Sequence, residues 1–483
     1  MSKELNTLEP QLLWKHFAAL SAIPRPSKKE AKAVEFVKNF AIAQGLDYTV
    51  DATGNVIVRK PATEGMENRP GIVLQSHLDM VPQKNNDVQH DFAKDPIQAY
   101  VDGDWVKARG TTLGSDNGIG VAASLAVLEA KDLVHGPIEA LFTIDEETGM
   151  TGANGLQAGV LKGSFFLNLD SEEEGELCIG CAGGVNLTVA IPYDSETPDK
   201  STEACKLTLT GLKGGHSGTD INIGRGNANT ILARYLWNAA AKYGVRLASI
   251  EGGNMRNAIP REATAVITVP TAKSADLQAY TAAFLKTVTA ELDGVEQGII
   301  FTAEKTALPA TVISKEAQSK IINTILVMPN GAQRMIADMP DVVETSTNLA
   351  IVKSDGKAVN IACLLRSSVD SAKDALAEEI SALAELAGSK AELSGGYPGW
   401  RPNFNSKILS VMKDTYKKTF NKEATVKVIH AGLECAIFGK NYPDMEFISF
   451  GPTILHPHSP GEKVSIPTVA QFWKYLVETL KAV

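Results

Sequence analysis

The chain has few cysteines and no apolar stretch long enough to cross a membrane. Its 483 residues include only five cysteines, an odd and sparse set that is unlike a disulfide framework. A membrane span needs about 20 consecutive apolar residues, and no run approaches that length. The charged first residues are not followed by the apolar stretch of a signal peptide. We therefore expect a cytoplasmic protein with no membrane partner.

An excess of positive charge is also absent. The chain carries 47 lysines and arginines against 56 aspartates and glutamates, which gives a formal net charge of -9. This acidic balance argues against nucleic acid as a partner. The composition, 44% hydrophobic and 21% charged, is that of an ordinary globular protein. The length predicts two or three domains.

Helices and strands alternate over the first part of the chain. Apolar residues at helical spacing predict a helix over 28–43, and a buried helix is expected over 117–130, with Asp116 where an N-cap or a ligand at the helix terminus would lie. Short apolar runs predict strands over 55–58, 71–74, 138–144 and 164–169. The alternation predicts a mostly parallel sheet flanked by helices, which is an α/β fold.

The pattern changes near residue 184. Polar and apolar residues then alternate, as in 206–210, which is typical of a sheet with one face in water. Helices are predicted over 227–243, 272–292, 314–326 and 371–387, and strands over 348–352 and 359–365. This order indicates an inserted α+β domain over 185–394, built from two similar sets of elements.

The α/β pattern resumes after residue 394. Helices are predicted over 406–418 and 469–480, and strands over 425–429 and 445–450. We therefore expect one α/β domain made of residues 1–184 and 395–483, with the insertion between its two parts.

Histidines and carboxylates follow apolar runs at five places in this expected domain. The five segments contain these residues: His77 and Asp79; Asp116; Asp145, Glu146 and Glu147; Asp170; and His458. Charged groups at the end of a buried strand are costly to desolvate unless an opposite charge compensates them. Parallel strands end at the same edge of a sheet, where α/β proteins bind ligands. Together the segments predict a cation cluster and therefore an enzyme.

The residue types suit divalent metal ions. Asp145, Glu146 and Glu147 would repel one another unless a cation neutralised at least one of them, although a solvated acidic turn is the alternative. With a metal present, one carboxylate can bind it while another stays free as a general base. Imidazoles and carboxylates without thiolates suit a catalytic zinc, manganese or cobalt ion better than a structural zinc. Five segments supply enough ligands for two ions.

The same segments resemble a known family. In order along the chain, the motifs are Gln75–Asp79, Gly114–Gly118, Asp145–Gly149, Asn168–Asp170 and His458–Pro460. They are similar to the motifs of the di-zinc exopeptidases, which include bacterial carboxypeptidase G and the carnosine-type dipeptidases. The resemblance covers almost the whole chain. It implies a catalytic domain over 1–184 and 395–483, a lid domain over 185–394, and two zinc ions, with cobalt or manganese as alternatives. It also implies hydrolysis of unblocked dipeptides, Xaa-His among them, by a homodimer.

The resemblance assigns a role to each residue of the expected cluster. Asp116 would bridge the two ions and be followed by a cis peptide bond. His77 and Asp170 would bind one ion, and Glu147 and His458 the other. Two residues would act beside the ions, Asp79 by orienting His77 and Glu146 as the general base.

Three residues of the inserted domain match the family's lid. His216, in Gly214–Gly218, resembles the lid histidine that helps to stabilise the oxyanion. Asn257 and Arg366 match positions that hold the substrate's C-terminal carboxylate, and an arginine can grip a carboxylate through two parallel hydrogen bonds.

The sequence leaves the roles of some residues undecided and allows alternative functions. His456 rivals His458 as a ligand, although the His-Ser-Pro context favours His458. Glu434 is either a substrate contact or, as we favour, an acid at the start of a helix. The run Glu172–Glu174 is predicted to be a solvated turn. The alternative functions are an amidohydrolase of N-acyl amino acids, a tripeptidase on the same scaffold, and an inactive scaffold that binds peptide or metal.

Overall fold

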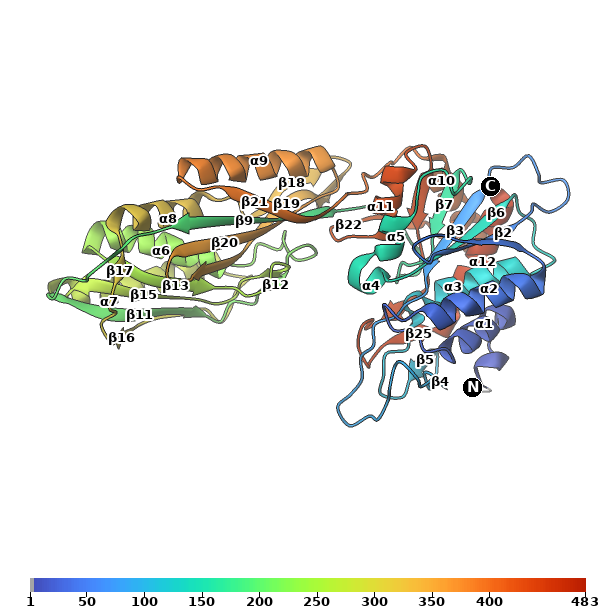
Figure 1. Ribbon diagram of the computed structural model, residues 1–483, viewed down its shortest axis with the longest axis horizontal. Coiled ribbons are helices and arrows are strands. Elements are labelled where there is room, and N and C mark those ends of the chain that lie inside the picture. The colour runs from blue at the N-terminus through green and yellow to red at the C-terminus, as the bar shows by residue number, and fades with distance from the viewer. Residues whose placement is uncertain (1–3) are drawn as a thin grey trace. The chain divides into compact units, whose positions relative to one another are not determined.

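A computed structural model of the protein describes residues 4–483. This part of the chain divides into two compact units, whose elements are labelled in Figure 1. The first unit comprises the chain up to Gly180, Trp400–Val428 and Leu433–Val483. The second unit comprises Cys181–Gly399 and the short segment Ile429–Gly432.

A mixed sheet forms the centre of the first unit. Its strands follow the order β1-β2-β6-β3-β7-β23-β8-β22. Their bounds are β1 (Asp47–Val50), β2 (Val56–Lys60), β3 (Ile72–His77), β6 (Ile138–Thr143), β7 (Phe165–Asn168), β8 (Glu176–Cys181), β22 (Thr425–Ile429) and β23 (Glu446–Ser449). β3 pairs in parallel with β6 and β7, and β7 pairs in parallel with β23. β2 and β8 pair antiparallel on either side of these strands. The predicted parallel sheet is confirmed, with antiparallel strands added at its sides.

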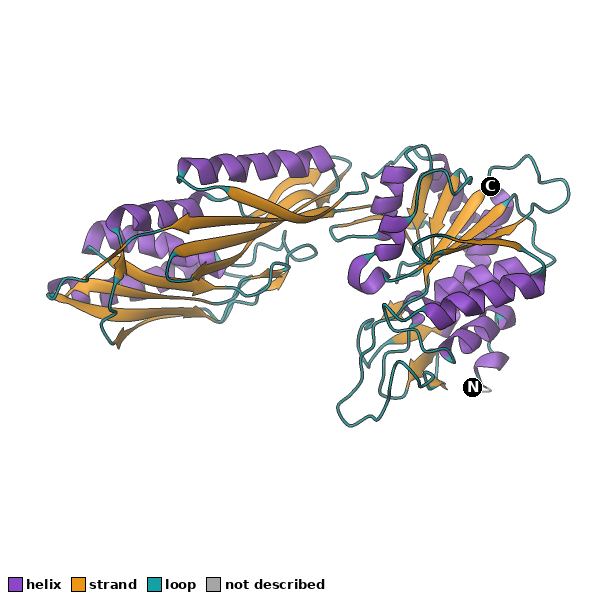
Figure 2. Cartoon of the chain, in the orientation of Figure 1, coloured by secondary structure: helices purple, strands orange, loops and turns teal. Residues whose placement is uncertain are grey.

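Helices flank this sheet, as Figure 2 shows. Their bounds are η1 (Leu5–Thr7), α1 (Gln11–Ser21), α2 (Ala31–Gln44), α3 (Ser115–Glu129), α4 (Glu146–Gly149), α5 (Thr151–Gly155), α10 (Lys407–Phe420), α11 (Glu434–Asn441) and α12 (Ile466–Ala482). The apolar face of α2 packs with α3 on the sheet in a core that includes Val37, Val58, Val121 and Phe142. The predicted helices 28–43 and 117–130 therefore form, and they form because their apolar residues cover β2, β3 and β6.

A small antiparallel sheet that the sequence did not reveal also belongs to the first unit. Its order is β24-β25-β5-β4. The strands are β4 (Ala99–Asp102), β5 (Trp105–Ala108), β24 (Ile454–Leu455) and β25 (Lys463–Ser465). The last two strands are too short to give a recognisable pattern in the sequence. They turn the segment between them, which contains His458, into the loop of a hairpin.

The second unit is an antiparallel sheet with helices packed on it. The sheet follows the order β16-β11-β15-β13-β19-β20-β9-β21, and β18 pairs with β19. Its strands are β9 (Gly183–Pro192), β11 (Thr202–Thr210), β13 (Arg246–Gly252), β15 (Ala263–Pro270), β16 (Ile300–Thr306), β18 (Gly331–Ile336), β19 (Met339–Ser354), β20 (Ala358–Ser367) and β21 (Ala391–Tyr397). The helices are α6 (Ala228–Tyr243), η2 (Thr271–Lys273), α7 (Ser274–Glu291), α8 (Lys315–Val327) and α9 (Asp370–Leu386). Two short ribbons pair β10 (Ser195–Glu196) with β17 (Val312–Ile313) and β12 (Gly215–His216) with β14 (Ala258–Ile259).

The two expected sets of elements in the insertion join into one sheet. β13 of the first set pairs with β19 of the second, so the strands are continuous across the unit. One apolar core runs beneath them and takes residues from all four long helices, for example Leu236, Phe284, Ile321 and Ile380. The insertion therefore folds around a single core that both sets of elements share.

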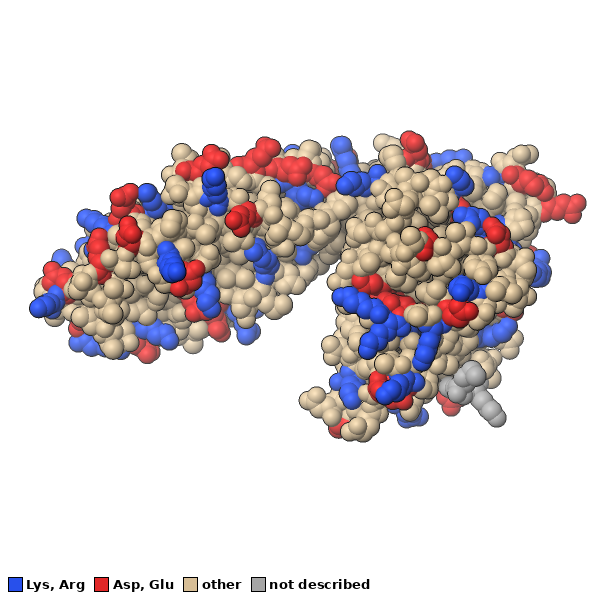
Figure 3. All heavy atoms as spheres, in the orientation of Figure 1, with Lys and Arg blue, Asp and Glu red and all other residues tan. Residues whose placement is uncertain are grey.

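The surface carries both signs of charge. Acidic and basic side chains are intermixed over the face of each unit that Figure 3 shows. A search of residues 4–483 finds no helix with the length and apolar character needed to cross a membrane.

Candidate metal centre

Three parallel strands of the first unit end at one edge of its sheet. The register pairs His77 with Thr143 at the ends of β3 and β6, and Gln75 of β3 with Asn168 at the end of β7. The residues that follow these strands therefore enter the same region. They are Asp79 after β3, Glu146 and Glu147 after β6, and Asp170 after β7.

A tight turn directs Glu146 and Glu147 into this region. Asp145 has a φ of 51°, a left-handed conformation that aspartate tolerates better than most residues. Its buried carboxylate accepts hydrogen bonds from the hydroxyls of Thr148 and Thr151. Asp145 thus shapes the start of α4, while its two neighbours carry the carboxylates that face the cluster.

Of the two roles expected for Asp116, that of the N-cap is wrong. Helix α3 begins at Ser115 with Gly114 at its N-cap, and Asp116 has non-helical backbone angles within the first turn. The peptide bond between Asp116 and Asn117 is cis, as the resemblance implied. Because the backbone departs from the helix here, the Asp116 carboxylate points to two histidines instead of to the helix N–H groups.

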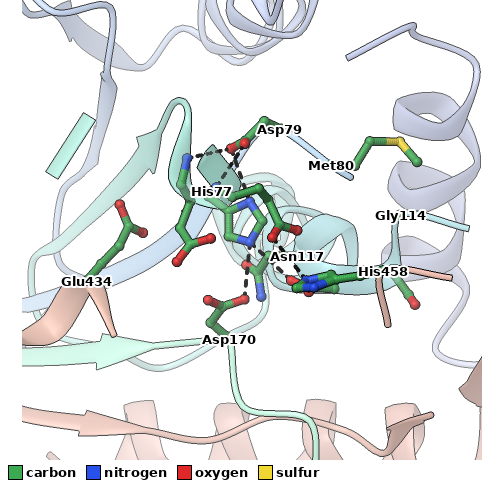
Figure 4. A network of polar contacts seen from close by, with 12 residues as sticks. His77, Asp79, Met80, Gly114, Asn117, Asp170, Glu434 and His458 are labelled. Carbon is green, nitrogen blue, oxygen red and sulfur yellow. Dashed lines mark hydrogen bonds and ion pairs between the residues drawn. The ribbon is translucent and has the colours of Figure 1, made fainter. Parts of the chain in front are cut away.

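The cluster is organised around the two oxygens of Asp116. Its Oδ1 lies 3.1 Å from His77 Nε2, and its Oδ2 lies 3.1 Å from His458 Nε2. His77 Nε2 is also 3.4 Å from Asp170 Oδ1, and His458 Nε2 is 3.0 Å from Glu147 Oε2. In Figure 4 the ring of His77 lies between Asp79 and Asp170. Asp116 therefore joins two groups of ligands, one on each of its oxygens.

These two groups are candidate metal-ion sites. Donor atoms of His77, Asp116 and Asp170 lie within 4.8 Å of one another, and so do those of Asp116, Glu147 and His458. His456, the rival of His458, is in none of the candidate groups found among residues 4–483.

The packing of acids and imidazoles shifts their pKa values. Burial alone would lower the pKa of His77, but Asp170, Asp116 and Asp79 raise it well above the usual value. Hydrogen bonds to Asp116 and Glu147 raise the pKa of His458 to about 11. Burial would raise the pKa of Asp116, but the two histidines hold it well below its usual range. Each imidazole thus faces negative charge, which a divalent cation can neutralise in place of protons.

The donor set fits divalent cations. Two imidazoles and three carboxylates converge without any thiolate, which is the chemistry of catalytic zinc and related ions. Glu147 Oε1 and Asp170 Oδ1 are buried and have no hydrogen-bond partner, although Asp170 Oδ1 has the ion-pair contact with His77. Buried charged oxygens are rarely left unsatisfied, so this arrangement is compatible with a cation site.

Asp79 and Glu146 lie beside these groups. Asp79 Oδ1 is 3.3 Å from His77 Nδ1, the ring nitrogen that faces away from Asp116. The Asp79 carboxylate also accepts hydrogen bonds from the Ser27 hydroxyl and from the backbone N–H groups of Glu146 and Glu147. Burial opposes ionisation, but His77 and these hydrogen bonds lower the pKa of Asp79 to about 2. Asp79 is therefore a carboxylate that holds the His77 ring.

Glu146 differs from its neighbour Glu147. Burial, together with the charges of Asp170, Glu434 and Glu147, raises the pKa of Glu146 well above the usual value. A carboxylate with a raised pKa takes up a proton readily, which is the property that a general base requires. Two adjacent glutamates thus lie in environments that suit different roles.

Two other acids of the first unit lie close to the cluster. Glu434 begins α11, as we favoured, and its buried carboxylate accepts hydrogen bonds from Gln75 at 2.6 Å and Thr143 at 3.0 Å. The expected solvated turn is wrong for Glu172, which is partly buried. Burial and the charges of Asp116 and Asp170 raise the pKa of Glu172 to about 8.

The three candidate lid residues lie together in the second unit. The backbone N–H of Ser217, next to His216, donates a hydrogen bond to the Asn257 carbonyl at 2.9 Å. Ser217 Oγ accepts from Arg366 Nε at 3.4 Å. The pairing of β12 with β14 and the pairing of β19 with β20 thus bring three distant segments to one place.

His216 is held in one tautomer. The backbone N–H groups of Gly218 and Thr219 donate to its Nδ1 at 3.3 and 3.2 Å. An acceptor at Nδ1 leaves the proton on Nε2, so the ring can donate a hydrogen bond there. Burial and the nearby Arg366 lower the pKa of His216, which keeps the ring neutral.

Arg366 is a buried cation that makes no ion pair with the acids of residues 4–483. Its side chain is bonded to Tyr397 Oη at 2.9 Å and to Ser217, both neutral partners. His430, also buried, bonds to Ser346 at 2.7 Å. Burial and the charge of Arg366 lower the pKa of His430 to about 3, so His430 stays neutral. A buried guanidinium among neutral groups suits an anionic ligand.

Two buried charged residues near the centre escaped the sequence reasoning. Arg25 and Glu462 both bond to the turn that precedes Asp116. Neither follows an apolar strand, so no pattern distinguishes them from surface charges. The position of Glu462 four residues after His458 is the one signal in the sequence that could have drawn attention to it.

Comparisons with known proteins identify the family. Residues 73–482 match the model of peptidase family M20/M25/M40. The cytosol non-specific dipeptidase of Escherichia coli strain K12 is 46% identical over 480 residues, which cover 99% of each chain.

Solved structures show the same fold. The aminoacylhistidine dipeptidase from Vibrio alginolyticus has a TM-score of 0.97 and 46% sequence identity, covering 100% of this chain and 98% of that one. A tripeptidase from Staphylococcus aureus has a TM-score of 0.55 at 16% identity, covering 98% of each chain.

Proposed function

Because the chain belongs to peptidase family M20/M25/M40, we propose that it hydrolyses unblocked dipeptides, Xaa-His dipeptides among them, with two divalent metal ions. The observation that carries this proposal is the position of Asp116, whose two oxygens each face a separate histidine and carboxylate. A carboxylate shared in this way is what a pair of neighbouring ions requires. Two relatives that align over nearly their whole length, and whose names describe dipeptidases, support the substrate class.

Five residues hold the ions in this proposal. His77 and Asp170 would hold the first ion, Glu147 and His458 would hold the second, and Asp116 would be shared between them. We propose zinc as the metal, with cobalt or manganese as alternatives that suit the same donors. When bound, the ions activate a water molecule and polarise the peptide carbonyl.

The protein's own residues move the proton and fix the ligands. Asp79 accepts the Nδ1 proton of His77, so that Nε2 is left to bind the ion. A carboxylate oxygen of Glu146 takes a proton from the attacking water and returns it to the leaving nitrogen, so the carboxylate is regenerated in each cycle.

The second unit supplies the groups that recognise a short peptide. Arg366 binds the C-terminal carboxylate of the dipeptide with Asn257 beside it, and the neutral His216 donates its Nε2 proton to the carbonyl oxygen. These roles agree with the unpaired charge of Arg366 and with the tautomer of His216. The guanidinium of Arg366 thus selects for substrates with a free C-terminal carboxylate.

Replacing Arg366 with leucine tests the recognition of the carboxylate. We expect kcat/KM for an Xaa-His dipeptide to fall by about 100-fold, since a buried, charged hydrogen-bond partner of the substrate is lost. The ratio of rates for a dipeptide and its C-terminal amide should also fall toward one. Steady-state kinetics with both substrates measures these changes. Arg334→Leu, at an exposed position of the same unit, should change neither value, and an unchanged ratio in Arg366→Leu would contradict the assignment.

A substrate panel tests the function itself. The purified enzyme is assayed with an Xaa-His dipeptide, a tripeptide and an N-acetyl amino acid, since a tripeptidase shares the fold. We expect the dipeptide to have the highest kcat/KM. Preference for the acetylated substrate would favour an amidohydrolase, and preference for the longer peptide a tripeptidase. Absence of both turnover and bound metal would favour an inactive scaffold.

We also propose a cytosolic homodimer. The name of the Escherichia coli relative places that protein in the cytosol, and the family resemblance implies the dimer. Light scattering at working concentration measures the mass of the assembly, which is expected to be twice the 51.5 kDa of the chain.

A further inference from the structure

A buried carboxylate from a distant segment binds the turn that precedes Asp116. Glu462, which is 2% exposed, accepts hydrogen bonds from the backbone N–H groups of Leu113 and Gly114 at 2.7 and 3.0 Å. Its other oxygen accepts from the backbone N–H and the hydroxyl of Ser115 at 2.7 and 2.6 Å. The N–H of Asp116 lies 3.3 Å from the same oxygen. Consecutive peptide groups of the turn therefore point at one side chain.

Glu462 belongs to the hairpin that carries His458. The two residues lie in the loop between β24 and β25, and the N–H of Glu462 donates to the Ser459 carbonyl at 3.0 Å. The next residue, Lys463, pairs with Lys107 of β5. Since β5 leads toward the Asp116 turn, the hairpin and the turn are connected at β25 and at the Glu462 carboxylate.

Arg25 binds the same turn with a positive charge. Its Nη2 donates to the Gly114 carbonyl at 2.5 Å, and its Nη1 donates to the carbonyls of Leu78 and Asp79 at 3.0 and 2.9 Å. A Cβ atom at Gly114 or Gly118 would lie 2.6 or 2.7 Å from Arg25 Nη2. The two glycines therefore make room for the guanidinium, which ties the turn to the end of β3.

Both charges are matched to the backbone of this turn. The carboxylate of Glu462 sits at the N-terminal end of α3, where the helix presents unpaired N–H groups and a partial positive charge. Arg25 sits on the carbonyl side of the same turn. Each buried charge is thus compensated by backbone dipoles that point toward it.

We propose that Glu462 is a positioning residue that fixes the distance between Asp116 and His458, and therefore builds the site of the second ion. This inference rests on the two-ion site of the proposed function. Glu462 touches no proposed ligand side chain; it acts through the backbone on which two of the ligands stand.

The contacts predict an unequal effect on the two ions. The second ion takes both Asp116 and His458 from segments that Glu462 joins, and only Glu147 comes from elsewhere. The first ion shares Asp116, but it takes His77 and Asp170 from the ends of β3 and β7, which are fixed by the sheet. Removing the Glu462 charge should therefore weaken the second ion much more than the first.

The test measures zinc binding to the full chain by equilibrium dialysis after chelation. Residues that orient metal ligands typically contribute about 10–100-fold in metal affinity. We expect Glu462→Gln to weaken the binding of one zinc ion by about that factor and the binding of the other by less than about three-fold. The amide keeps the size of the side chain but places an NH₂ group against N–H donors. Ser115→Ala, which removes only the hydroxyl contact, should weaken the binding of the same zinc ion by a smaller factor.

Two further variants distinguish a positioning role of Glu462 from a general effect on folding. Glu139→Gln removes another buried carboxylate that accepts backbone N–H groups, those of Lys162 and Gly163, and should leave both zinc affinities unchanged. In a His458→Ala background, Glu462→Gln should cause no further loss of zinc, since the second site is already lost. The inference would be overturned if Glu462→Gln weakened the binding of both zinc ions equally, or if its loss of zinc affinity added to that of His458→Ala. A wild-type chain that binds fewer than two equivalents would instead contradict the proposed function.

Discussion

Replacing Glu146 with glutamine is expected to lower kcat for an Xaa-His dipeptide by about 1,000-fold, within the range that a lost general base produces. Glutamine keeps the shape of the side chain but cannot accept and return a proton. The proposed ligands are His77, Asp116, Glu147, Asp170 and His458, and none of them is changed. Both zinc ions should therefore remain bound, as measured by elemental analysis of the purified variant.

A control at an exposed glutamate tests whether the effect is specific to Glu146. Glu173→Gln, at an exposed position near Asp170, should keep wild-type activity and metal content. A Glu146→Gln variant that retains activity would exclude Glu146 as the base. A variant that loses metal along with activity would show instead that Glu146 is a ligand, since it does lie in one candidate group with His77 and Glu147.

The Asp116→Asn variant is expected to lose both ions and at least about 1,000-fold in activity, because metal-activated water is then lost together with the polarised carbonyl. A neutral amide offers one oxygen where the carboxylate offers two. Each ligand group would lose the charge that it shares with the other. Elemental analysis should give well under one zinc per chain.

Single-site variants show whether Asp116 is shared. Asp170→Asn removes a ligand of one group alone, so about one zinc per chain should remain. Asp87→Asn, an exposed aspartate of the same unit, should keep two. If Asp116→Asn retained one tightly bound zinc, Asp116 would serve a single ion and the bridging role would be excluded.

Much of the centre follows from the sequence because strand ends are recognisable. The apolar runs that end at His77 and before Asp145 and Asp170 are buried strands of the sheet, and their parallel pairing brings the next polar residues to one edge. The same patterns gave most helices of both units to within a few residues. Local periodicity was sufficient here because each element buries one continuous apolar face.

Other features depend on contacts that no local pattern encodes. β24 and β25 are too short to show alternation, so the hairpin around His458 could not be predicted. Glu462 is buried only because that hairpin pairs with β5, and Arg25 only because the chain packs over Gly114 and Gly118. Similarly, the acidic run at Glu172 resembled a solvated turn until the fold placed Asp116 and Asp170 near it.

The single core of the second unit also depends on the pairing of two strands that are distant in the sequence. The order of its predicted strands and helices, without a clear sequence repeat, predicted two similar sets of elements. The pairing of Glu251 and Gly252 in β13 with Lys353 and Val352 in β19 merges them. Sequence patterns predict which strands exist, whereas the choice of partner strand is decided by the packing of the whole unit.

The order of ligands along the chain has a consequence for biosynthesis. His77 and Asp170 are made early, the second unit follows, and His458 is made last of the five proposed ligands. β23, which lies between β7 and β8 in the sheet, is translated equally late. Because folding proceeds largely from the N-terminal side during synthesis, the nascent polypeptide carries an incomplete hydrolytic centre. The proposed metal centre can therefore close only after the segment that carries His458 has been translated.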